Sequence, residues 1–114
     1  MTKLLALGVA AAAMLGASST PARLGVSARE YRLVLSRASV KAGRVVIQLQ
    51  NDGEDPHDLR LRRVGGSHTF RLALTQPGGR AELDVHLRPG RYRLWCSVAD
   101  HAQLGMRALL RVRR

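Results

Sequence analysis

Residues 91–106 read RYRLWCSVADHAQLGM, and they join a strand pattern to a group of possible metal ligands. Apolar residues and arginines alternate at the start of this stretch, which predicts an extended strand with one face in a core. The only cysteine of the chain, Cys96, is then followed at even spacing by His101 and Met106. We therefore expect a strand whose C-terminal end leads into a group of possible metal ligands.

Similar period-two segments recur along the whole chain, separated by turn residues such as glycine, proline, asparagine and aspartate. They predict strands at residues 28–36, 44–50, 57–64, 70–74, 82–87, 91–96 and 106–112. Short strands at this spacing are typical of two packed sheets. The sequence thus predicts an all-β fold, a Greek-key β-sandwich or barrel of about seven antiparallel strands with little helix.

The N-terminal segment differs in composition from the rest of the chain. Lys3 precedes an apolar run of 12 residues, 4–15, and small and polar residues follow it. This order is typical of a secretory signal peptide, and the run is shorter than the about 20 apolar residues that cross a bilayer. We predict a signal peptide over residues 1–22, with an approximate cleavage position, and one domain over residues 23–114. The domain is then exported to a periplasm, a cell envelope or the medium.

Arginine supplies most of the positive charge of the chain. Of 19 basic residues 17 are arginine, against 8 acidic residues, and the net charge is +11. Removal of residues 1–22 takes away only Lys3 and leaves +10. Such a charge favours acidic partner proteins or contact with an anionic membrane surface, and a solvated arginine-rich face without a partner is the alternative. Few aromatic residues and the absence of a binding motif argue against nucleic acid.

A thiol, an imidazole and a thioether are together soft ligands for a metal ion. Cys96 has no partner for an internal disulfide, which leaves metal ligation, an intermolecular bridge or an unprotected thiol. His57 follows the turn-rich residues 51–56 and begins a strand, so it can supply a second imidazole. Two histidines, one cysteine and a weak axial methionine suit copper in electron transfer. The alternative is that the cysteine and the methionine are ordinary core residues.

Two motifs in this order, NDGEDPH at 51–57 and CSVADHAQLGM at 96–106, resemble the copper-binding segments of the cupredoxins, the small blue copper proteins. The second is most similar to the loop of the rusticyanin and sulfocyanin types. The resemblance implies a cupredoxin-like sandwich and one type 1 copper ion. Its equatorial ligands would be His57, Cys96 and His101, and its axial ligand Met106.

The sequence departs from the family pattern beside these ligands. Residues 99–100 are Ala-Asp where related loops often have Pro-Gly, and Asp58 stands where many members have an asparagine that ties the ligand loops together. An ionised carboxylate near copper favours Cu(II) and lowers the reduction potential. His68 and His86 lie in a loop and on a solvent-facing strand position, so we expect neither to take part.

The function that the resemblance implies is an exported, monomeric electron carrier that exchanges single electrons with redox partner proteins. The resemblance also implies two routes by which an electron can reach the copper. One is the aromatic residue before the cysteine, here Trp95, and the other is the exposed edge of His101. Simple packing of Trp95 on the outer face of the sheet is the alternative. Copper storage, delivery or resistance is a second function, and a metal-free β-sandwich interaction domain a third. An enzyme is not expected, because no further catalytic group of residues is evident.

Overall fold

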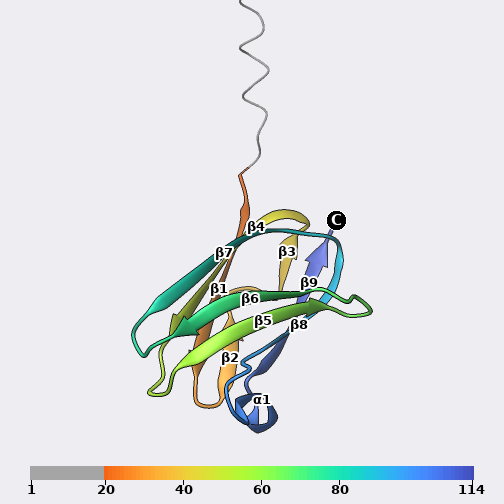
Figure 1. Cartoon of the computed structure of the whole chain (residues 1–114). Helices are drawn as coiled ribbons and strands as arrows, with labels where there is room; N and C mark the ends of the chain where they lie inside the picture. The colour runs from red at the N-terminus through yellow and green to blue at the C-terminus, as the bar shows by residue number, and fades with distance from the viewer. Residues whose placement is uncertain (1–19) are drawn as a thin grey trace, which may run out of the picture.

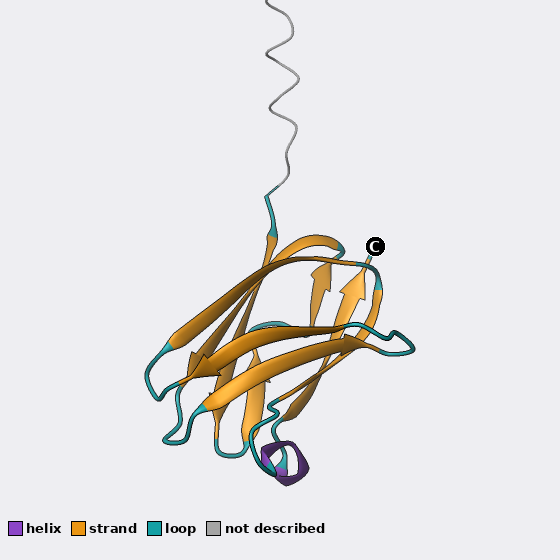
Figure 2. Ribbon diagram, in the orientation of Figure 1, coloured by secondary structure: helices purple, strands orange, loops and turns teal. Residues whose placement is uncertain are grey.

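The computed structural model describes residues 20–114, which form a sandwich of two β-sheets (Figures 1 and 2). The predicted all-β sandwich is therefore confirmed. In order along this part of the chain, the elements are β1 (Ala22–Arg29), β2 (Arg32–Leu35), β3 (Ser39–Lys41), β4 (Gly43–Asn51), β5 (His57–Arg63), β6 (Thr69–Thr75), β7 (Arg80–Leu87), β8 (Gly90–Trp95), α1 (His101–Leu104) and β9 (Arg107–Arg113).

Both sheets are mixed. One has four strands in the order β2-β1-β4-β7, and the other has five in the order β3-β9-β8-β5-β6. The pairs β1–β4 and β3–β9 are parallel, and the remaining pairs are antiparallel. The prediction of purely antiparallel strands is wrong at these two pairs, because an alternating pattern shows which side chains face the core and not which way the neighbouring strand runs.

The segment predicted as one strand over residues 28–36 is in fact a hairpin. β1 ends at Arg29, β2 begins at Arg32, and these two residues pair across the turn. Glu30 and Tyr31 form the turn without glycine, proline or asparagine, so the usual sequence signals of a turn are missing. A further difference is the single helical turn of α1, in a segment where the sequence predicts only an irregular loop.

The core lies between the sheets and is built from aliphatic side chains on alternating strand positions. Leu24 and Ile47 come from the four-stranded sheet, and Leu61 and Leu94 from the five-stranded sheet, all at most 1% exposed. Burial of such side chains is the main stabilising contribution of a small domain. The two sheets thus form a fixed frame, and α1 lies at the end of the sandwich away from the C-terminus (Figure 1).

The predicted signal peptide lies almost wholly outside the described residues, and it stays a prediction. The last residue of that segment, Ala22, is the first residue of β1 and packs against the core. Within residues 20–114, no helix has the length and apolar character needed to cross a membrane.

A core substitution should separate buried from exposed leucines. Leu61 is 0% exposed, so Leu61→Ala is expected to lower the free energy of unfolding by about 3 kcal/mol, since the cavity it leaves is not refilled. Leu109 is 54% exposed on β9, and Leu109→Ala is expected to change it by less than about 0.5 kcal/mol. Urea unfolding followed by tryptophan fluorescence measures both; equal losses would contradict the assignment of the core.

Candidate metal centre

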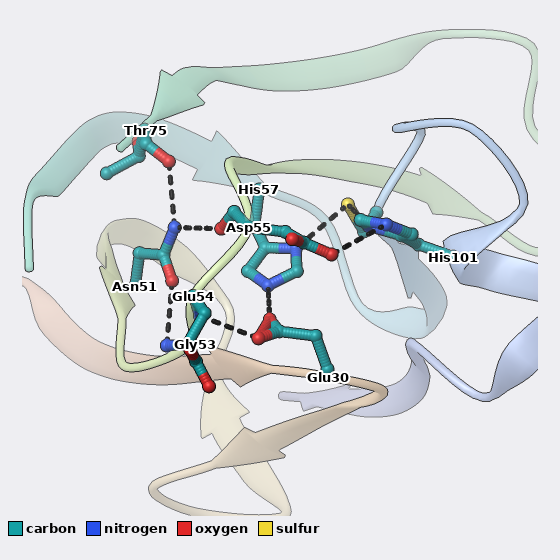
Figure 3. Close-up of polar contacts among 9 residues, drawn as sticks. Glu30, Asn51, Gly53, Glu54, Asp55, His57, Thr75 and His101 are labelled. Carbon is teal, nitrogen blue, oxygen red and sulfur yellow. Dashed lines mark hydrogen bonds and ion pairs between the residues drawn. The ribbon is translucent and has the colours of Figure 1, made fainter. Parts of the chain in front are cut away.

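Three of the four predicted ligands meet at one end of the sandwich. His57 begins β5, Cys96 directly follows β8, and His101 begins α1. The Nδ1 atoms of His57 and His101 each lie 3.8 Å from the Cys96 sulfur. One ligand atom from each residue lies within 4.8 Å of the others, and all three side chains are buried. Figure 3 shows the imidazoles of His57 and His101 near each other at this end.

Met106 lies beside this cluster and is 0% exposed. Its main-chain N–H donates a hydrogen bond to the carbonyl of His101 at 3.0 Å, and its carbonyl accepts one from the N–H of Cys96 at 3.2 Å. These bonds connect the backbone of Met106 to two of the three clustered residues. Axial metal ligation by Met106 remains a prediction.

Main-chain hydrogen bonds hold the loop between Cys96 and Met106. The N–H of His101 donates to the carbonyl of Val98 at 2.9 Å, which turns the chain into α1. Gly105 ends the turn with φ of 129°, and a Cβ atom there would lie 2.7 Å from the carbonyl oxygen of Tyr31. Only glycine combines that dihedral angle with so close an approach. The loop is thus well defined without the Pro-Gly sequence of related loops.

Asp58 joins the two parts of the chain that carry His57 and Cys96. Its carboxylate accepts hydrogen bonds from the main-chain N–H of Ser97, at 2.6 Å, and from the Ser97 hydroxyl. Asp58 is 7% exposed, and the guanidinium of Arg60 lies 3.7 Å away. The carboxylate thus makes the cross-link that the family resemblance assigns to an asparagine.

Two further carboxylates face the outer nitrogens of the imidazoles. Glu30 Oε2 lies 2.5 Å from His57 Nε2, and Asp55 Oδ2 lies 3.6 Å from His101 Nε2 (Figure 3). A carboxylate that accepts the proton of Nε2 leaves the lone pair of Nδ1 free, and Nδ1 is the atom that faces Cys96 in both rings. Glu30 therefore holds the His57 ring for metal binding through a hydrogen bond, whereas Asp55 lies near His101 beyond hydrogen-bond distance.

Glu30 is itself held by the loop that precedes His57. Its carboxylate accepts the main-chain N–H of Glu54 at 2.6 Å. This bond, followed by the contact with His57, lowers the pKa of Glu30 despite partial desolvation. A Cβ atom on Gly53 would clash with the carboxylate, so the glycine makes room for it.

Asn51 fixes the shape of the same loop. Its amide nitrogen donates to the carbonyls of Asp55 and Thr75, at 2.8 and 2.9 Å, and its oxygen accepts the N–H of Gly53 at 2.9 Å (Figure 3). The asparagine and the glycine of the NDGEDPH motif thus have separate structural tasks. Together they place Glu30 and Asp55 beside the histidines.

The thiol of Cys96 is protonated more firmly than an ordinary cysteine in the absence of a metal ion. Burial raises its pKa, and main-chain hydrogen bonds near Val98 and Asp58 counter this effect only in part. A bound cation stabilises the thiolate directly, so metal binding and loss of the thiol proton are coupled.

The remaining site predictions differ in their outcome. The edge of His101, expected to be exposed, is covered: the residue is 6% exposed, and the ring of Tyr31 lies 5.2 Å from its own. His68 and His86 lie outside the cluster and line a separate hollow with Tyr92. The sequence analysis did not predict the roles of Glu30 and Asp55. The one sequence signal for Glu30 is its acidic side chain inside an otherwise alternating segment.

Comparison with known proteins places the fold. No family model matches the chain, and no curated protein matches its sequence. Among solved structures, reduced auracyanin from Roseiflexus castenholzii matches with a TM-score of 0.67 and 12% identity, over 84% of this chain and 100% of that one. Auracyanin A from Chloroflexus aurantiacus, a "blue" copper protein, matches with a TM-score of 0.65 and 17% identity, over 82% of this chain and 99% of that one.

A larger protein contains the same architecture. A multicopper oxidase matches with a TM-score of 0.63 and 14% identity, over 98% of this chain and 48% of that one. Sequence identity is low in every case, while the path of the strands is shared. The described chain is a β-sandwich with the cupredoxin fold.

Proposed function

We propose that this chain is a type 1 copper protein that carries single electrons between redox partners. The observation that supports it most is the pair of Nδ1 atoms, from His57 and His101, each 3.8 Å from the Cys96 sulfur in a buried cluster. Two imidazoles and a thiolate are the equatorial donors of blue-copper sites, and a thioether is their weak axial donor, which Met106 would supply. When bound, the copper ion supplies a reversible change between Cu(II) and Cu(I).

The surroundings of the cluster suit electron transfer better than reaction with a substrate. His57 and Cys96 are both 0% exposed, so a substrate has no direct access to them. Asp58 and Glu30 hold the ligand segments through hydrogen bonds, and such support keeps ligand positions constant when the charge of the site changes. An electron carrier needs this constancy, because movement of ligands slows transfer.

Copper storage, delivery or resistance is the second function, and a metal-free interaction domain the third. The burial of the three side chains favours an ion that is retained over one that is exchanged. Export and a redox partner with an acidic surface remain part of the proposal, supported by the N-terminal composition and by the net charge of +11.

The first prediction of this proposal concerns the visible spectrum. The copper-loaded protein should show an intense thiolate-to-copper absorption band and reversible one-electron reduction, and Cys96→Ser should lose the band because no thiolate remains. His86→Gln serves as the control, since this histidine lies outside the cluster and should leave the band unchanged. A pale wild type with exchangeable copper would favour copper handling, and a wild type that binds no copper would overturn both copper functions.

The second prediction concerns protons. Because burial raises the pKa of Cys96, the thiol is protonated near neutral pH and must release its proton when the metal binds. Binding of Cu(I) without oxygen should release about one proton at pH 7.5 and become about tenfold tighter per pH unit up to the thiol pKa. Calorimetry in buffers of different ionisation enthalpy counts the protons. Release of the same proton by Cys96→Ser would exclude the thiol as its source.

The third prediction concerns Glu30. Its negative charge, 2.5 Å from the outer nitrogen of His57, stabilises the more positive Cu(II) state. Glu30→Gln keeps the shape and removes the charge, so the reduction potential should rise by about 60 mV, which corresponds to a tenfold change for one electron. Glu54→Gln removes an exposed charge of the same loop as a matched control and should have a smaller effect. An equal shift in both variants would show that only net charge matters.

A further inference from the structure

On the outer face of the five-stranded sheet, all charged side chains but one are basic. We call it the arginine face; its basic residues, on alternating positions of five neighbouring strands, are Lys41, Arg60, Arg62, Arg71, Arg91, Arg93, Arg107, Arg111 and Arg113. The only acidic residue on these strands is Asp58, which is 7% exposed and bonded to Ser97. The face therefore presents one sign of charge to the solvent.

Several of these charges lie directly opposite one another in the sheet. Arg62 is paired with Arg93, and Arg91 with Arg111. Like charges at directly opposite positions destabilise a sheet. The outer face of the four-stranded sheet is different, because there Arg44 makes a two-pronged ion pair with Asp84 at 2.7 to 3.3 Å. An arrangement that fold stability disfavours points to an anionic ligand outside the chain.

One end of the arginine face, beside the turn between β5 and β6, has a hollow that can hold acidic side chains. A hollow of about 340 Å³ is lined by Arg62, Arg63, Arg93 and Trp95, together with the turn at 64–66. Main-chain carbonyls position two of the guanidinium groups: Gly66 accepts from Arg62 at 3.0 Å, and Pro89 from Arg63 at 2.7 and 2.9 Å. Fixed guanidinium groups with free donors bind carboxylates with little loss of entropy, and tryptophan is a frequent anchor of protein interfaces.

The opposite charge is found at the end of the sandwich that holds the metal cluster. Glu30 and Asp55 contact the histidines there, and Glu54 and Asp100 lie in the same loops. An acidic partner is repelled from this end and attracted to the arginine face. Because Trp95 on that face is bonded directly to Cys96, a partner docked there still lies close to the cluster.

We propose that the arginine face is the docking surface for an acidic protein partner; the identification of that partner as a redox protein rests on the proposed function. An anionic bilayer is a poorer match. Insertion into lipid needs a continuous apolar face, and the large apolar side chains Trp95 and Leu109 of the arginine face stand among nine basic residues. Carboxylates on a folded surface match the spaced guanidinium groups instead.

The test uses an octaglutamate peptide as the acidic probe. The peptide is titrated at low salt into the whole ¹⁵N-labelled protein loaded with Cu(I). We expect amide shifts on the strands that carry the arginine face, β5, β8 and β9. The double variant Arg62→Gln, Arg93→Gln should bind about fivefold more weakly. The double variant Arg32→Gln, Arg80→Gln removes two exposed arginines from the four-stranded sheet and should bind less than about twofold more weakly.

Each other outcome overturns the proposal. Shifts centred on α1, or equal weakening by both double variants, would show that the peptide senses only the net charge or another surface. Vesicles of phosphatidylcholine and phosphatidylserine form the second arm, and vesicle binding that exceeds peptide binding and depends on Arg62 and Arg93 would favour a membrane.

Unchanged core amide shifts verify that the variants fold. The titration involves no electron transfer, so its failure leaves the copper proposal standing, and a colourless protein would leave the docking result standing.

Discussion

The hydrogen bonds between Asp58 and Ser97 connect the two distant parts of the chain that form the site. Asp58 follows His57 at the start of β5, and Ser97 follows Cys96 at the end of β8. Because β5 and β8 are neighbours in one sheet, these bonds close the open end of their pairing. The positions of the imidazole and the thiol then follow from the sheet itself, and Glu30, Asn51 and the turn of α1 add orientation to a frame that already exists.

Much of this arrangement could be predicted from the sequence, because it depends on local patterns. The alternation that ends at Cys96 predicts β8, and the even spacing to His101 and Met106 predicts a single loop that turns back on itself. The parallel pairs β1–β4 and β3–β9 could not be predicted in this way, since alternation does not show which way a neighbouring strand runs. The same holds for Glu30, whose role depends on a contact with a residue 27 positions away.

The acidic and basic residues are divided between two regions, and this division has a physical logic. The carboxylates of Glu30 and Asp55 lie beside the imidazoles, where their negative charge would stabilise a bound cation. Most of the arginines on the outer face of the five-stranded sheet have no acidic neighbour on those strands; Arg60, beside Asp58, is the exception. A net charge of +11 describes neither region, because it averages an acidic end and a basic face. Long-range attraction of a partner depends on the separate fields of these regions.

Cys96 links the two regions through the geometry of a strand. Side chains of a strand alternate between its faces, so Cys96 points into the core while Trp95, one residue earlier, lies on the arginine face. The same strand therefore serves the buried cluster with one face and the solvent with the other. This placement allows the cluster to stay sealed from water behind Tyr31 and Asp55 while the protein still presents a surface within one residue of the thiol. Burial of the proposed copper site and access of the proposed partner are compatible in this fold for that reason.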